Sequence, residues 1–420
     1  MQSHRIGALI AALIGLTWSA HAQQVALSSP ASWTRDGFQA GTFQAGGVAT
    51  SGKSLTHTLQ IGRTGIDLTL SDEIEYSDNV RVEQKGRDGM SNTFKLSLDS
   101  SWSPTKVQDI ALSGELSSRV PIFGPGKGRV LWNVSPNTAA KMNVYVDQLR
   151  ISPFVRASRS LDPVAATVVS QTETFTQTMY DAGVVADYPL YKANLQFIAL
   201  AGTKRSAAEN APAMFTERYS TALRAVKVFA PGSVAGADLA TYSQSYENGP
   251  SRNSYGQGVS AFVRWPLTKL MSGQFSTGWD TQNFSKIRDR TDSKKASEPF
   301  YSASISHQPN AALSYSLLVR HAVFDGVSTN YFKSLEYSIS PKYTLSPNLS
   351  VNGSVTFKTA DESTALGDHG HNVMSSIGAS YNTKGGTHFS ATYNFVDKVS
   401  SIAVREYTQN RFTLTISRKL

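Results

Sequence analysis

The last ten residues of the chain, RFTLTISRKL, keep a strict two-residue alternation up to the C-terminus. Phe412, Leu414 and Ile416 are each separated by one polar residue, and Leu420 keeps the same phase. Successive side chains of a β-strand point to opposite faces, so this pattern predicts a strand with one apolar and one polar face. Soluble domains usually end in a frayed polar tail. Alternation that continues to the last residue therefore predicts that the final strand is paired along its whole length as part of a sheet.

The same alternation recurs along the chain, and no segment after residue 22 has a convincing helical period. It is clearest over residues 91–102, 255–265, 313–319, 348–358, 372–382 and 387–396. The polar faces are mostly Ser, Thr, Asn and Gly, and most of the charge falls in the connections. The solvated face of a soluble β-sandwich is usually rich in charge. A water-filled lumen therefore suits this composition better than bulk solvent does.

Short turns rich in Pro and Gly alternate with longer polar connections. Proline has no N–H to give to a central ladder, so it marks chain reversals. The predicted short turns are 103–106, 135–138, 188–191, 230–233, 265–268, 308–310, 346–348 and 382–386. Tight periplasmic turns and longer external loops are typical of outer-membrane barrels. The rhythm predicts an all-β, antiparallel, up-and-down transmembrane β-barrel of about 16–18 strands over residues 63–420.

The N-terminal residues predict export. Arg5 precedes an apolar run from Ile6 to Trp18, and the following SAHA is a small-x-small cleavage pattern. These features are typical of a secretory signal peptide over residues 1–22. The apolar run is too short for a membrane-spanning helix, which needs roughly 20 residues. Residues 23–62 contain the tandem repeat FQAGTFQAG and are predicted to form a periplasmic segment or a plug.

Composition excludes several classes of protein. The chain has no cysteine, which excludes a lipoprotein anchor, disulfides and cysteine nucleophiles. Its formal net charge is +9, but the basic residues are scattered and form no stripe. A nucleic-acid partner is therefore not expected. A basic channel or a rim that faces lipopolysaccharide explains this charge better.

Two stretches resemble those of known barrels. The terminal pattern resembles the C-terminal assembly signal of Gram-negative outer-membrane barrels, which implies recognition by the barrel assembly machinery. The matching positions are Phe412, Leu414, Ile416 and Leu420. Arg418 departs from the pattern, and Leu420 stands where Phe or Trp is usual. EYSDNV, at 75–80, resembles a Tyr-x-Asp-Asn-Val element of large barrels encoded beside exopolysaccharide loci, although a turn uses Asp and Asn for ordinary reasons.

A barrel of this size encloses an aqueous lumen, so the first functional hypothesis is a porin-like channel for small polar or anionic solutes. Basic residues are expected in the loops 120–129, 156–167 and 204–213. The candidate pore or rim charges are Lys127, Arg129, Arg156, Arg159, Lys204 and Arg205. In a loop that folds inward, these charges would favour anions. On the outer rim, they would contact lipopolysaccharide instead.

Two other classes of function stay open. One is a barrel associated with an exopolysaccharide or another surface polymer. The other is an outer-membrane enzyme, but no G-x-S-x-G nucleophile motif occurs, and we assign no catalytic residue and no cofactor. Asp368, His369 and His371 would suit a transition metal, but two histidines in a solvated loop are a weak signal, so no metal site is assigned. The expected partners are outer-membrane lipid, lipopolysaccharide and small solutes or polysaccharide, together with a second copy of the chain.

Overall fold

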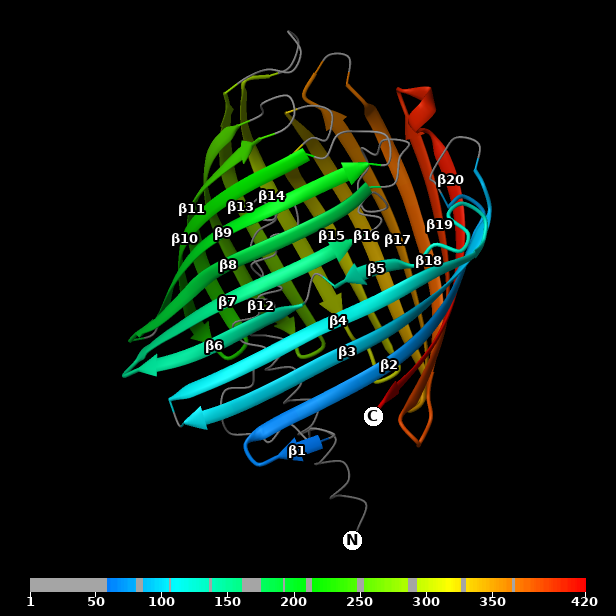
Figure 1. Cartoon of the computed structure of the whole chain (residues 1–420). Coiled ribbons are helices and arrows are strands. Elements are labelled where there is room, and N and C mark those ends of the chain that lie inside the picture. Colours follow the sequence, from blue (N-terminus) through cyan, green and yellow to red (C-terminus); the bar gives the residue numbers. More distant parts are fainter. Residues whose placement is uncertain are drawn as a thin grey trace.

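The computed structural model describes residues 59–80, 86–105, 107–135, 138–160, 175–191, 193–208, 214–247, 253–285, 293–325, 330–364 and 367–420. These residues form one 20-stranded antiparallel sheet that curls into a barrel (Figure 1). Within these ranges, no helix is long and apolar enough to cross a membrane. The predicted signal peptide, 1–22, and all but the end of the predicted segment 23–62 lie outside the described residues.

In the part of the chain that the structure describes, the strands follow one another in sequence, with one short 3-10 helix near the end. The first ten are β1 (Leu59–Ile61), β2 (Thr64–Ser77), β3 (Gly89–Thr105), β4 (Gln108–Phe123), β5 (Leu131–Val134), β6 (Ala139–Val146), β7 (Leu149–Ser160), β8 (Phe175–Leu190), β9 (Ala193–Ala208) and β10 (Met214–Ala230). The rest are β11 (Ser233–Tyr246), β12 (Ser254–Thr268), β13 (Met271–Phe284), β14 (Lys295–His307), β15 (Leu313–Asp325), β16 (Tyr331–Ser346), β17 (Leu349–Glu362), β18 (His369–Asn382), β19 (Thr387–Ser400), η3 (Ala403–Arg405) and β20 (Tyr407–Lys419).

The barrel closes because the first long strand pairs with the last. β2 pairs with β3 on one side and with β20 on the other, in register from Thr69 opposite Lys419 to Ser77 opposite Arg411. β5 and β6 together fill one position, since each lies between β4 and β7. The short β1 pairs only with β2. The wall therefore has 18 strand positions, which confirms the predicted antiparallel barrel.

Six of the eight predicted turns lie where consecutive strands meet, at the end of the barrel where the C-terminus lies (Figure 1). The predicted turn 265–268 instead forms the paired end of β12, and the chain reverses just after it, at 269–270. The prediction of a reversal at 135–138 is wrong. That segment lies between β5 and β6, which both pair with β4, and the Ser135 N–H donates to Glu115 O at 2.9 Å. The chain reverses instead at Asp147, which has a positive φ of 54°.

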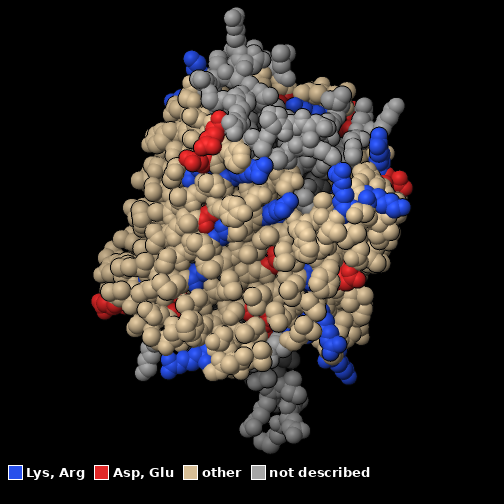
Figure 2. Space-filling view, viewed as in Figure 1, with Lys and Arg blue, Asp and Glu red and all other residues tan. Residues whose placement is uncertain are grey.

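Apolar side chains cover the outer wall. Outward-facing Val259, Val355 and Phe412 are 55, 50 and 44 % exposed, as expected for side chains that face lipid rather than a core. Trp102 and Tyr188 are exposed within a few residues of the short turns, where aromatic girdles form at a membrane interface. Figure 2 shows a wall that is mostly uncharged, with Lys and Arg mainly in its upper and lower parts. The predicted alternation of lipid-facing and lumen-facing residues is therefore present.

Asp72 places a carboxylate on the apolar outer face. Asp72 lies in register between Phe94 of β3 and Ile416 of β20, two residues from the outward-facing Ile74. The Asn92 amide donates a hydrogen bond of 2.7 Å to Asp72 Oδ1. A charge on the lipid face of a barrel lowers its stability, and a single amide bond offsets only part of that cost.

We therefore expect the double replacement Asp72→Leu/Asn92→Leu to stabilise the folded barrel, on the order of 1–2 kcal/mol. Urea unfolding in lipid vesicles measures the change as a higher midpoint. Asp67→Leu is the matched control, because Asp67 lies on the inner face of the same strand and pairs with Lys419 Nζ at 2.8 Å. That variant should lose stability. A lower midpoint for the double variant would contradict the assignment of Asp72 to the lipid face.

Candidate functional site

The inner wall is the surface that a solute would meet. On β16 to β20 it consists largely of hydroxyl and amide side chains that bond across neighbouring strands. Thr356 donates to Ser338 at 3.0 Å, and the hydroxyls of Ser354 and Ser376 lie 2.8 Å apart. These residues hold water-accessible polar groups without fixed charge. The predicted Ser, Thr and Asn faces thus line the lumen.

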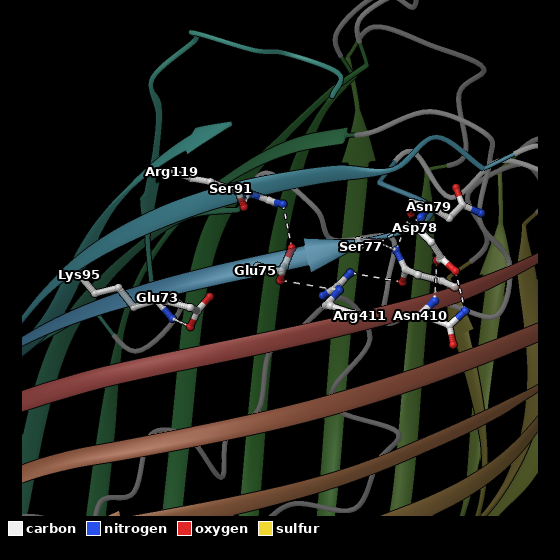
Figure 3. Close-up of polar contacts among 11 residues, drawn as sticks. Glu73, Glu75, Ser77, Asp78, Asn79, Ser91, Lys95, Arg119, Asn410 and Arg411 are labelled. Atoms are coloured by element: carbon white, nitrogen blue, oxygen red, sulfur yellow. Dashed lines mark hydrogen bonds and ion pairs between the residues drawn. The ribbon is translucent and has the colours of Figure 1, made fainter. Parts of the chain in front are cut away.

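A group of polar residues joins β2 to β20 at the external end of the barrel, and we call it the closure seam (Figure 3). The Asn410 backbone N–H and side-chain amide donate to the two carboxylate oxygens of Asp78 at 2.7 and 2.5 Å. The Gln409 amide donates to Ser77 Oγ at 3.2 Å and to Asn79 O at 2.6 Å. Ser77, Asp78 and Asn79 belong to EYSDNV, so this element fastens the first strand to the last.

Glu75, in the same element, lies below the closure seam on the inner wall between two arginines (Figure 3). Arg119 Nη2 of β4 lies 2.9 Å from one Glu75 carboxylate oxygen, and Arg411 Nε of β20 lies 3.7 Å from the other. Two residues along β2, Glu73 pairs with Lys95 Nζ at 2.6 Å. The Glu75 cluster has two guanidiniums for one carboxylate and therefore carries net positive charge.

A second cluster of the same kind lies on β7, β8 and β10. Asp181 accepts hydrogen bonds from Arg156 Nε at 2.9 Å and from Arg218 Nη2 at 2.6 Å, and all three side chains are buried. Breaking a buried ion pair leaves an uncompensated charge and is costly, which fixes this geometry. A third basic group follows on β15 to β17, where Arg320 bonds Glu336 at 2.5 Å and Lys358 pairs with Glu336 in the register. Each cluster again holds two cations and one carboxylate.

The six predicted basic residues divide among three places. Lys127 and Arg129 are exposed in the connection between β4 and β5, as predicted. The other four were expected in loops, and that expectation is wrong. Arg156 and Arg159 lie in β7, and Lys204 and Arg205 lie in β9. β7 and β9 continue for several residues past the point where apolar and polar residues stop alternating. The prediction, which relied on that alternation, therefore ended both strands too early.

Alternation then separates the four strand residues. Arg156 and Lys204 lie on the inner wall, where register places Lys204 beside Met179 and Thr216. Arg159 and Arg205 are exposed on the outer wall. Only Arg156 and Lys204 of the six can therefore act on a solute inside the barrel wall.

The predicted Asp368, His369 and His371 group is divided as well. His369 and His371 lie in β18 rather than in a loop, and the His371 ring lies 5.5 Å from the Phe357 ring. The buried Asp368 instead accepts a hydrogen bond from Ser400 and pairs with Lys398 at 3.7 Å. No group of three possible metal ligands occurs among the described residues.

The structure also shows aromatic rings packed on glycines of neighbouring strands, which the sequence analysis did not predict. Inward-facing aromatic rings lie flat against the wall where a neighbouring strand has glycine. The pairs are Phe154 on Gly183, Phe262 on Gly236, Tyr242 on Gly256 and Phe300 on Gly278, and a Cβ at each glycine would overlap the ring. The Tyr242 hydroxyl reaches across to donate to Asp280 at 2.9 Å. Rings that lie along the wall do not project into the lumen.

The four residues of the predicted assembly signal all lie on the outer face. They are Phe412, Leu414, Ile416 and Leu420, each 44–51 % exposed. The Leu420 backbone N–H donates to Leu68 O at 2.9 Å, which extends the β2–β20 ladder by one bond. The geometry explains their alternation as lipid contact, and recognition by the assembly machinery stays a prediction.

Comparison with known families agrees with this architecture. The family described as "Putative beta-barrel porin 2" matches residues 176–420, more than half of the chain. The chain belongs to this porin family. It is a porin-like barrel of the outer membrane. None of the curated proteins matches the sequence.

Solved structures show the same fold as this porin at low sequence identity. A BenF-like porin from Pseudomonas fluorescens is 11 % identical, with 86 % of this chain and 100 % of that chain covered and a TM-score of 0.51. OccAB2 from Acinetobacter baumannii is 12 % identical, with 86 % and 98 % covered and a TM-score of 0.50. The FrpB iron transporter from Neisseria meningitidis is 12 % identical, covers 80 % of this chain and has a TM-score of 0.50. The porin spans only 62 % of the FrpB chain.

A double-mutant cycle at the closure seam tests its contribution to this porin. Asp78→Ala and Asn410→Ala should each lower the free energy of unfolding, with a coupling of about 1–2 kcal/mol because they remove one shared set of bonds. Urea unfolding in vesicles gives the four values. Asp397→Ala is the control, since it removes a 3.0 Å bond from the Thr408 hydroxyl between β19 and β20 and leaves the bonds between Asp78 and Asn410 in place. Additive effects of Asp78→Ala and Asn410→Ala would contradict a shared interaction.

Gly256→Ala tests whether glycine keeps a ring against the wall. The added methyl would overlap the Tyr242 ring, displace it toward the lumen and break its bond to Asp280. We expect a lower single-channel conductance with the barrel still folded. Gly258→Ala is the matched control on the same strand and face, because its Cβ would lie 3.4 Å from Asp280 Oδ1, an ordinary contact. Equal conductance of the two variants would refute this explanation.

Proposed function

We propose that this porin is a passive diffusion channel for small polar solutes with a preference for anions. The observation that carries the proposal is the ratio of charges in the inner-wall clusters. Glu75 lies between Arg119 and Arg411, and Asp181 between Arg156 and Arg218. Each carboxylate supplies one negative charge against the two positive charges of the guanidiniums that bind it. The two clusters lie on different strands, β2, β4 and β20 for one and β7, β8 and β10 for the other, so an excess of positive charge occurs on two parts of the lumen wall.

The size of the barrel supports diffusion rather than tight binding. Barrels with 16–18 strands enclose an aqueous channel, whereas barrels of eight strands are filled by side chains. A wall of low dielectric constant weakens screening of the charges that line it. An anion in the lumen therefore meets a lower electrostatic barrier than a cation of the same size.

Membership of a porin family favours the channel over the enzyme hypothesis, because porins are channels. The seam role of EYSDNV explains why its Ser, Asp and Asn are present, so the element needs no polymer-related function. We also expect that the predicted signal peptide, residues 1–22, directs export and that the porin forms homo-oligomers. An association with exopolysaccharide stays a prediction from resemblance alone.

The reversal potential of the refolded protein in a planar bilayer under a salt gradient tests the proposal. The unmodified chain should give steady openings with anion preference. Arg411→Gln should reduce that preference, because Glu75 then has only Arg119 as a partner. Glu75→Gln should increase it, since the same cluster then loses its negative charge. Changes of opposite sign at one site separate an electrostatic effect from a general loss of structure.

Two results would count against this function. A folded, inserted barrel without conductance would exclude an open diffusion channel. A conducting barrel with cation preference, or with equal responses to Arg411→Gln and Glu75→Gln, would show that the two-to-one clusters do not set the selectivity.

A further inference from the structure

A shallow apolar groove of about 630 Å³ lies on the outer wall over β4 and β6 to β10. Strand register aligns its floor across neighbouring strands: Ala140 is beside Val155, Val155 beside Ala182, and Ala182 beside Ala201. Ala201 is in turn beside Tyr219, which is 54 % exposed. Methyl side chains between larger ones leave a depression that faces the lipid.

Two arginines lie on the external side of this groove. Arg159 of β7 and Arg205 of β9 are both paired with Thr178 of β8, so the three residues form one outward-facing row. Tyr180, two residues further along β8, lines the groove below them. The two arginine Cα atoms are two strand spacings apart, about 10 Å. A phosphate group between them is within reach of both guanidiniums.

These arginines differ from those of the inner wall. Within the described ranges, neither Arg159 nor Arg205 forms an ion pair with a carboxylate, whereas Arg156 and Arg218 share Asp181. The Arg205 guanidinium lies over the Phe215 ring at 5.3 Å, which holds it at the outer surface. An outward-facing carboxylate, Glu217, lies one row lower, beside Thr203. Cations without a carboxylate partner at the edge of an apolar groove suit an anionic amphiphile.

We propose that the groove and the two arginines bind a phosphorylated glycolipid of the external leaflet, of the lipid A class. An acyl chain lies in the alanine-floored groove, and a phosphate is held between Arg159 and Arg205. Arginine binds phosphate through two parallel N–H donors, which gives orientation as well as affinity. The row of arginines lies toward the end opposite the short turns and the C-terminus, which is the external end of such barrels. The head group and the chain thus face the correct directions for that leaflet.

The site is on the outside of the barrel and is independent of conduction. Native mass spectrometry of the full-length mature chain in detergent, with added lipid A, measures binding directly. We expect retained lipid A on the unmodified protein and affinity lowered about tenfold for each of Arg159→Gln and Arg205→Gln. Lys227→Gln is the matched control, since Lys227 is exposed on the outer face of β10 near the opposite end. Its affinity should stay unchanged.

The groove is tested separately from the arginines. Ala182→Trp fills the floor and should displace the acyl chain, with binding lowered at least about tenfold. Ala237→Trp is its control, because Ala237 is in register between Ala225 and Ala261 of another part of the wall. The heat-dependent mobility of the barrel on denaturing gels shows that each variant is folded. A variant that fails to fold is replaced by Ala201→Trp on the same floor.

Three results would overturn the proposal. Equal binding of dephosphorylated lipid A would remove the role of the arginines, and unchanged affinity in the arginine variants would do the same. Equal binding of phosphatidylglycerol would show a general anionic-lipid surface rather than a site for a phosphorylated glycolipid. Lipid A binding that is lost with both the arginine and the groove variants, and kept in both controls, supports it.

Discussion

The pairing of β2 with β20 is the interaction on which the rest of the structure depends. An open sheet would expose a row of backbone N–H and C=O groups to hydrocarbon, where nothing can satisfy them. The two strands lie more than 300 residues apart in the chain, so closure orders nearly the whole of it. A slip of one residue would exchange every inner and outer side chain of the last strand. The bonds between Asp78 and Asn410 stabilise one register at the external end of that seam.

Once the register is fixed, the inner wall can combine charge with open space. Hydroxyl pairs such as Ser354 and Ser376 satisfy each other across strands, and Asp181 satisfies two arginines at once. Aromatic residues add apolar area without narrowing the lumen, because glycine on the next strand lets a ring such as Tyr242 lie flat on Gly256. The wall is therefore well packed within its own thickness, and its surface stays accessible to water.

Features that depend on residues close together in the sequence could be predicted, and features that depend on contacts between distant strands could not. Alternation and turns depend on neighbouring residues, so the barrel and most reversals could be predicted. The segment 135–138 could not, because a proline that ends one strand looks the same whether the next strand turns back or continues along β4. The contacts of Asp78 with Asn410, and of Tyr242 with Gly256, depend on register between strands. No single stretch of sequence contains that information.

The two basic pairs on β7 and β9 show how strongly strand parity decides function. Arg156 and Arg159 are three residues apart and therefore lie on opposite faces, as do the adjacent Lys204 and Arg205. On β7, Arg156 faces the lumen and pairs with the buried Asp181, whereas Arg159 is exposed on the lipid-facing side. In the sequence, these four basic residues look like parts of basic loops. In the structure, two of them face the lumen and two form a row on the lipid-facing side. The wall between them is a single strand thick, so the lining of the lumen and the contact with the membrane are specified by the same segments.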